Sequence, residues 1–187
     1  MLANFIVQPV KRVITFAKLI PDFRRRDIVD QMNLLKGSTM EITICSSSTL
    51  YDEGENRFVN VISKDRQLAE SSVPAASSNI QLDIMRLIWS PEVFEKTLAF
   101  LRSMSELRID EATLILFLPC ILFAPDRREI TDRRLVCALQ SKYSFLLKKY
   151  MHWKYGKSAA DKLYAKLMLK LIELRSLREM HRYVETE

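Results

Sequence analysis

Side chains that could carry out chemistry are few in this chain of 187 residues. It contains two histidines, His152 and His181, and no glycine-rich phosphate loop. It also lacks the His-Glu-x-x-His and Gly-x-Ser-x-Gly motifs that mark zinc-protease and serine-hydrolase sites. We therefore expect a protein that is not an enzyme and needs no cofactor.

The three cysteines, Cys45, Cys120 and Cys137, are far apart and form no Cys-x-x-Cys pair. This spacing indicates neither a disulfide framework nor a zinc finger, so we expect no metal site. Each cysteine lies in apolar sequence, which predicts a buried, inert thiol in a reducing compartment.

The elements that must position these side chains are expected to be mainly helical, because the chain has only 3 Gly and 6 Pro. Apolar spacing and capping residues predict helices over 10–20, from Asp27 to about residue 44, from Ile80, from Ser90, from Asp110, over 135–155 and over 158–184. Pro9 either sits in the first turn of the first helix or kinks a longer helix that includes residues 2–8. Residues 46–62 predict one short hairpin and residues 70–79 a loop.

The net charge of +6 lies entirely in residues 142–187. This basic end either attracts an acidic partner or is the solvated face of a long helix. The last helix carries two apolar stripes, which indicate a partner subunit or central burial within the monomer. The longest apolar run, residues 114–125, is shorter than the roughly 20 residues that span a bilayer, and no secretory signal is visible, so we expect no membrane association.

Two stretches in the first fifth of the chain carry a family signature. Residues 16–23 read Phe-Ala-Lys-Leu-Ile-Pro-Asp-Phe and residues 30–36 read Asp-Gln-Met-Asn-Leu-Leu-Lys, and together they resemble the signature of nuclear-receptor ligand-binding domains. Residues 124–127, 163–166 and 174–181 look like later segments of the same family, in the same order. The resemblance covers about residues 4–182 and is closest to the vitamin D receptor group with its invertebrate xenobiotic- and sterol-sensing relatives.

This resemblance implies an all-α fold, a three-layer antiparallel helical sandwich with one small β-hairpin. It implies a single domain over residues 1–187 that lacks the family's first and last helices and its DNA-binding domain, so that DNA would be reached only through a domain absent here. It also implies a lipid-regulated transcription factor located in the nucleus. Arg26 departs from the family, which usually has Leu at that position.

The resemblance places a pocket for a small lipophilic ligand, sterol-like or xenobiotic, among eight positions. These are Ile6, Val10, Met40, Thr43, Ile44, Ser47, Phe58 and His181. The apolar members are equally compatible with an ordinary core, and Thr43 and Ser47 with hydrogen bonds to their own helix. His181 is either a surface residue or the partner of a ligand hydroxyl.

A second implied surface is the groove that binds coactivator or corepressor helices. Its positions are Ile14, Lys18, Gln31, Met32, Leu35 and Lys36. Lys18 would cap the peptide's free carbonyl groups, while the opposing Glu of the family belongs to the last helix. We therefore expect weakened coactivator binding and better tolerance of longer corepressor helices, or simply two exposed lysines.

The third implied surface is a dimer interface, typically with the retinoid X receptor. The candidate residues are Tyr164, Lys166, Met168, Lys170 and Arg175. Glu41 and Arg127 match an ion pair that links two distant parts of the family fold. The alternative function is a ligand-independent dimerisation and coregulator-binding module, a dominant-negative truncated receptor.

Overall fold

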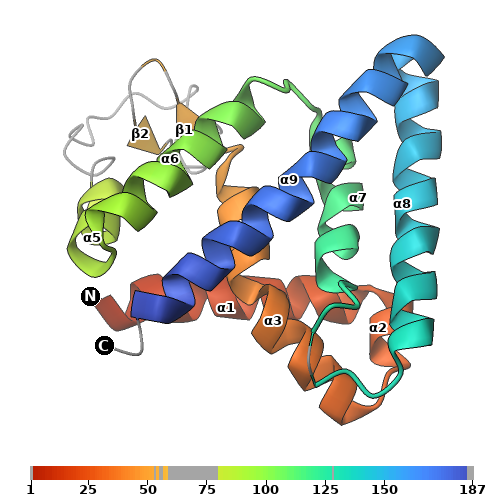
Figure 1. Cartoon of the computed structure of the whole chain (residues 1–187), viewed down its shortest axis with the longest axis horizontal. Helices are drawn as coiled ribbons and strands as arrows, with labels where there is room; N and C mark the ends of the chain where they lie inside the picture. The colour runs from red at the N-terminus through yellow and green to blue at the C-terminus, as the bar shows by residue number, and fades with distance from the viewer. Residues whose placement is uncertain (1, 53, 55–56, 59–79, 128, 185–187) are drawn as a thin grey trace, which may run out of the picture.

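The computed structural model describes residues 2–52, 54, 57–58, 80–127 and 129–184 (Figure 1). The helices are α1 (Leu2–Leu19), α2 (Pro21–Arg24), α3 (Ile28–Ser47), α5 (Ile80–Ile88), α6 (Pro91–Ser105), α7 (Glu111–Leu122), α8 (Arg133–Tyr155) and α9 (Lys157–Val184). Strands β1 (Tyr51–Asp52) and β2 (Arg57–Phe58) pair antiparallel, with Tyr51 opposite Phe58. The predicted hairpin is confirmed over these four residues, while the predicted loop at 70–79 lies outside the described residues.

Short polar side chains fix the start of four helices, three of which, at Asp27, Ser90 and Asp110, the sequence predicts. Asp27, Ser90, Asp110 and Asp132 each accept a hydrogen bond from a backbone N–H two or three residues further along. These caps satisfy N–H groups that have no partner inside the helix. Gly156 separates α8 from α9 with a positive φ of 78°, a conformation that other residues rarely adopt.

Prolines 9 and 119 lie inside helices α1 and α7. The prediction that Pro9 sits in the first helical turn is wrong, and the alternative of a longer helix is confirmed because α1 begins at Leu2. Likewise α3 continues to Ser47, a few residues beyond its predicted end. The hydroxyl of Ser47 donates to the carbonyl oxygen of Thr43 at 2.8 Å, so this serine satisfies its hydroxyl within the helix.

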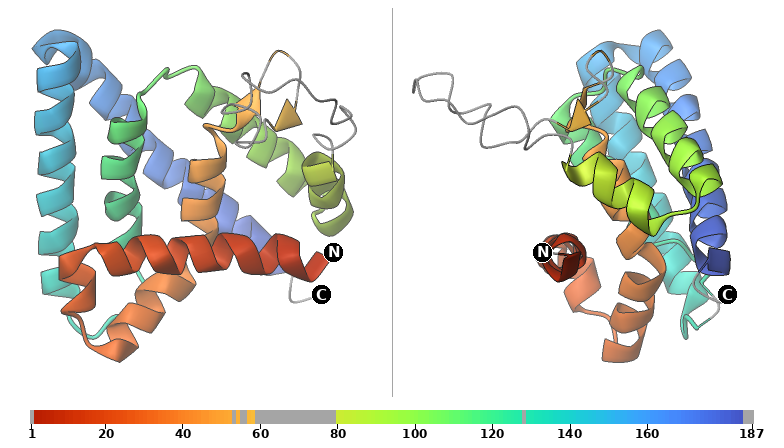
Figure 2. Two further views of the ribbon diagram at one scale, coloured as in Figure 1. Left: turned by 180° about the vertical axis from the view of Figure 1, so that it is seen from behind. Right: turned by 90° about the vertical axis from the view of Figure 1, so that its left-hand side faces the viewer.

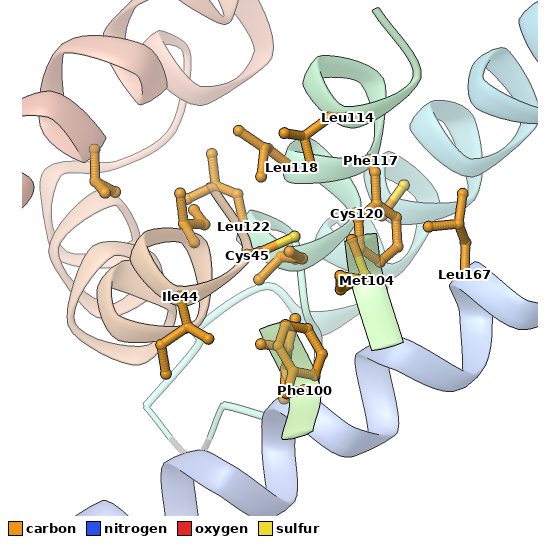
Figure 3. Close-up of a cluster of buried hydrophobic side chains, with 14 of the residues drawn as sticks. Ile44, Cys45, Phe100, Met104, Leu114, Phe117, Leu118, Cys120, Leu122 and Leu167 are labelled. Carbon is orange, nitrogen blue, oxygen red and sulfur yellow. The ribbon is translucent and has the colours of Figure 1, made fainter. Parts of the chain in front are cut away.

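The helices form three layers, as expected, with α3 in the centre. α1 packs on one side of α3, and α6 and α9 pack on the other, while α7 packs against both α3 and α8 (Figure 2). Figure 3 shows the centre of this arrangement, where Phe100 and Met104 of α6, Phe117 of α7 and Leu167 of α9 meet. The fold is therefore the helical sandwich that the sequence resemblance implies.

Cys45 and Cys120 are completely buried in this core (Figure 3). Burial raises the pKa of the Cys120 thiol to about 12 and that of Cys45 higher still, so both thiols are unreactive, as predicted. For Cys137 the prediction of burial is wrong, because this residue lies on an exposed face of α8. Among the residues described here, no helix has the length and apolar character needed to cross a membrane.

Asp110 ties the start of α7 to the end of α8. It accepts hydrogen bonds from the Thr113 backbone and from the hydroxyls of Tyr150 at 2.5 Å and Tyr155 at 3.0 Å. Burial works to raise the pKa of this carboxyl, but the hydrogen bonds from Thr113, Tyr150 and Tyr155 outweigh it and lower the pKa to about 2.

Candidate functional site

A buried ionic node joins α3, the segment after α7, and α9. Arg127 donates to both carboxylate oxygens of Glu41, one of them at 3.2 Å, and both side chains are almost completely buried. Arg178 of α9 lies 3.6 Å from the same carboxylate and donates to the carbonyl oxygen of Gly37 at 3.5 Å. Burial raises the pKa of Glu41, and the charge of Arg178 opposes that rise. The predicted pairing of Glu41 with Arg127 is confirmed.

Gly37 makes room for this node. A Cβ atom at position 37 would lie 2.6 Å from Cδ and 2.7 Å from Nε of Arg127. The arginine therefore crosses α3 where the helix has no side chain, and the bidentate contact with Glu41 holds it there. Sequence analysis missed this role, because a glycine inside a helical pattern carries no sign of the distant residue that passes over it.

His181 lies near the end of α9 and is 8% exposed. Its ring meets the ring of Trp89, between α5 and α6, edge to face with centroids 4.5 Å apart. The buried Nε2 atom has no hydrogen-bond partner among the described residues. Burial lowers the pKa of the imidazole to about 4, so the ring is neutral at physiological pH. The surface alternative is therefore wrong, and within the described part of the chain the imidazole is neutral with Nε2 unpartnered.

The other predicted ligand positions lie on the facing elements α1 and α3 and in the hairpin. Ile44 and Phe58 are buried in the core, whereas Val10, Met40, Thr43 and Ser47 are half-buried. α1 packs against α3, and β2 contacts α5, the helix that precedes Trp89. The side chain of Ile6 lies outside the described residues. Contact of these residues with a ligand stays a prediction.

The predicted coregulator positions lie on α1 and α3, which pack together. Lys18, Met32 and Lys36 are exposed, and Ile14 and Leu35 are half-buried. Gln31 donates to the backbone carbonyl oxygens of Arg26 at 2.8 Å and Arg24 at 3.4 Å, so it also holds the turn between α2 and α3. Peptide binding by these residues stays a prediction.

The predicted dimer positions on α9 point in different directions. Lys166 is exposed, and Arg175 forms a half-exposed ion pair with Asp126 at 3.2 Å. Tyr164 and Met168 both contact Ser144 of α8.

Lys170 is turned toward α6 and is 8% exposed. It donates to Ser103 at 2.8 Å and to Glu173 at 2.7 Å, beside an open depression of about 560 Å³ between α6 and α9. Its charge therefore serves a contact within the chain. The dimer interface itself stays a prediction.

Three residues of these sites were not singled out from the sequence: Gly37, Trp89 and Arg178. Arg178 lies within the matched segment 174–181, and Trp89 immediately precedes the Ser-Pro helix start, so both had a positional signal. Neither signal shows that the side chain faces inward, which depends on how α9 crosses α3 and α6.

Comparison with known proteins agrees with the resemblance seen in the sequence. The family described as the ligand-binding domain of nuclear hormone receptor matches residues 2–184. The chain is 29% identical to the vitamin D3 receptor of Bos taurus over 180 residues and 30% identical to that of Mus musculus over 183 residues. In both comparisons the match covers 96% of this chain and 40% of the receptor. The chain thus spans about two fifths of the length of these relatives.

Proposed function

Because the chain belongs to the family of nuclear hormone receptor ligand-binding domains, we propose that it binds a small lipophilic ligand and thereby regulates transcription in the nucleus. In this proposal residues 1–187 act as one domain that responds to its ligand by a shift in conformational equilibrium. The shift changes which coregulator helices the domain binds, and a second receptor subunit completes the complex.

The observation that carries the ligand proposal is the buried Nε2 of His181, which has no hydrogen-bond partner among the residues that the structure describes. A buried polar atom without a partner costs free energy, so such atoms are rare unless they serve a function. A neutral imidazole can donate to, or accept from, a ligand hydroxyl, and the ring of Trp89 supplies an apolar wall beside it. Val10, Met40, Thr43, Ile44, Ser47 and Phe58 are the proposed further contacts, together with Ile6.

The coregulator proposal concerns the exposed face of α1 and α3. An amphipathic helix binds by apolar residues at i, i+3 and i+4, for which Ile14, Met32 and Leu35 are the proposed contacts. Lys18 and Lys36 are exposed at its margin and would interact with the negative end of the peptide dipole.

The dimer proposal concerns α8 and α9. Large apolar side chains are exposed on both helices, among them Phe145 at 67% and Trp153 at 78% on α8, and Leu169 and Ile172 on α9. Such residues are depleted on surfaces that face only water. We propose that they contact a retinoid X receptor or a second copy of this chain, together with Tyr164, Lys166, Met168 and Arg175.

The ligand proposal is tested by native mass spectrometry of protein purified from eukaryotic cells, with lipid extraction from the same sample. We expect a lipid of discrete mass on the wild-type protein and about tenfold less of it on His181→Phe, because one hydrogen bond to a buried group is lost. His152→Phe is the matched control. His152 is partly exposed and pairs with Asp161 at 2.8 Å, away from Trp89, so its replacement leaves lipid retention unchanged.

Reproducibly empty wild-type protein would contradict the ligand proposal. It would instead favour the ligand-independent dimerisation and coregulator-binding module. Equal lipid retention by wild type and His181→Phe would show that His181 does not bind the ligand, while the proposal of a ligand pocket would still stand.

A further inference from the structure

The turn between α2 and α3 carries three consecutive arginines, Arg24, Arg25 and Arg26, here called the basic turn. Gln31 of α3 holds this turn by its hydrogen bonds to the carbonyl oxygens of Arg24 and Arg26. Because Gln31 is itself a proposed coregulator contact, the basic turn lies at the edge of the proposed binding face. These hydrogen bonds fix the backbone of the basic turn, so the fold determines where the three arginines begin.

The acids near the basic turn are already engaged. Asp22 accepts from Lys142 at 2.6 Å and from Tyr143 at 2.8 Å, and it forms a longer ion pair with the exposed Arg25 at 4.0 Å. Asp27 caps α3 by accepting from Val29, and Asp30 is buried and accepts from Thr131.

Arg24 and Arg25 are exposed, and Arg26 is half-buried. In the part of the chain that is described, Arg24 forms no ion pair, so its guanidinium group is open to a carboxylate of a partner. Lys18 and Lys36 likewise form no ion pair among the described residues. The proposed face is thus bordered by an excess of positive charge.

Apolar side chains are exposed beside these charges. Ile28 is 66% exposed and Val29 is 52% exposed in the first turn of α3, and Met32 follows one turn later on the same face as Ile28. The apolar surface therefore extends past Met32 to the basic turn. A helix that covers it must continue to the point where the arginines lie.

We propose that this surface selects amphipathic helices that carry acidic residues at the end of the apolar face lying beside the basic turn, where they contact Arg24, Arg25 and Arg26. The inference rests on the proposed coregulator function and names the class of helix that it prefers. Guanidinium groups bind carboxylates in a bidentate fashion and are weakly hydrated, so the basic turn favours Glu or Asp over a neutral amide. Electrostatic contacts at the margin mainly set partner choice and the rate of association.

The test uses fluorescence-polarisation titrations of the full chain with one Leu-x-x-Leu-Leu helix peptide in three versions. The flanking residues are glutamates at the N-terminal end, glutamates at the C-terminal end, or glutamines at both ends. We expect one of the two glutamate peptides to bind about fivefold more tightly than the glutamine peptide, as two or three exposed ion pairs would give. This difference in affinity becomes smaller as the NaCl concentration is raised from about 50 to about 300 mM, because salt screens exposed charges.

The variant Arg24→Ala/Arg25→Ala removes this preference but leaves the affinity for the glutamine peptide unchanged. The matched control, Lys149→Ala/Lys162→Ala, removes the same charge from exposed positions on α8 and α9 and retains the preference. Equal binding of glutamate and glutamine peptides by the wild type would overturn the inference, and so would a preference that the arginine variant retains.

Met32→Glu separates this outcome from failure of the proposed function. If Met32→Glu abolishes binding of every peptide, the proposed face is correct and only its charge preference is at stake. If Met32→Glu leaves all affinities unchanged, the coregulator face itself is wrong.

Discussion

Arg178 and His181 lie less than one turn apart on α9, but their side chains enter two different regions. The regions differ in whether the described residues supply hydrogen-bond partners for the buried polar side chain. Arg178 joins a node in which Glu41, Arg127 and the carbonyl oxygen of Gly37 supply partners from within the chain. His181 enters a region in which its Nε2 has none among the described residues. A buried group with partners inside the chain stabilises the fold, whereas a buried group without them calls for another explanation, which for His181 is the proposed ligand. Arg178 therefore has a structural role, whereas His181, three residues later, has the proposed ligand-binding role.

Arg127→Met breaks the node and has the largest expected effect. It leaves the carboxylate of Glu41 buried without its bidentate partner, so we expect a loss of about 3–5 kcal/mol in the free energy of unfolding. Urea denaturation followed by circular dichroism measures this. Arg175→Met is the control, because its pair with Asp126 is half-exposed and should cost less than about 1 kcal/mol. Equal losses for the two variants would show that the node contributes no more than a surface pair.

Gly37→Ala tests whether the node depends on the missing side chain. The added Cβ lies 2.6 Å from Arg127, and overpacking of this kind costs about 1–3 kcal/mol. In the Arg127→Met background the flexible end of the methionine side chain moves away from the added Cβ, so the clash is relieved. The alanine then stabilises α3 by up to about 1 kcal/mol through its higher helix propensity. The same denaturation assay on the wild type, the two single variants and the double variant gives the coupling free energy between the two positions. If the changes in the free energy of unfolding were additive, a Cβ at position 37 would not contact Arg127.

The pH dependence of stability sharpens the contrast at His181. Its pKa is about 4 in the folded chain and 6.5 as a free side chain, so the unfolded chain takes up the proton first as pH falls. The contribution of His181 to stability is therefore complete above about pH 6.5 and decreases toward pH 4, at up to about 1.4 kcal/mol per pH unit. Glu41, whose pKa is raised by burial, changes stability in the opposite direction as pH falls, so the difference between wild type and His181→Phe isolates the contribution of the histidine. Asp110, with a pKa of about 2, loses its contribution only below this window. Unfolding curves between pH 8 and pH 4 measure the slope, and His181→Phe should reduce it; an unchanged slope would contradict the assignment.

His181→Phe at about pH 8 has the smallest expected effect on stability. The substitution removes a buried polar atom that has no partner in the described part of the chain, and it retains an aromatic ring against Trp89. The free energy of unfolding therefore changes by less than about 1 kcal/mol. Thermal unfolding of ligand-free protein measures it. A loss as large as that of Arg127→Met would mean that His181 is part of the structural core, and the contrast between the two ends of α9 would fail.

Local signals predicted the helix starts well, because a cap is formed by residues two or three positions apart. Asp27, Ser90 and Asp110 are examples, and each cap is present. The same locality explains the failures at Pro9 and Cys137. Whether a proline continues a helix, or a cysteine on an amphipathic helix faces inward, depends on what packs against that face.

The candidate sites divide in the same way. The resemblance of residues 16–23 and 30–36 to a family signature identified the fold and pointed to His181, Lys18 and Glu41. It did not distinguish Lys170, which is held by Ser103 and Glu173 within the chain, from Lys166, which is exposed. The sequence by itself determined the helices, the family and the pairing of Glu41 with Arg127, because these follow from local pattern and matched motifs. Only the tertiary structure decided that Gly37 admits Arg127 and that His181 is buried with no partner for Nε2 among the described residues. The physical reason is that burial and long-range contact depend on where α9 crosses the rest of the molecule.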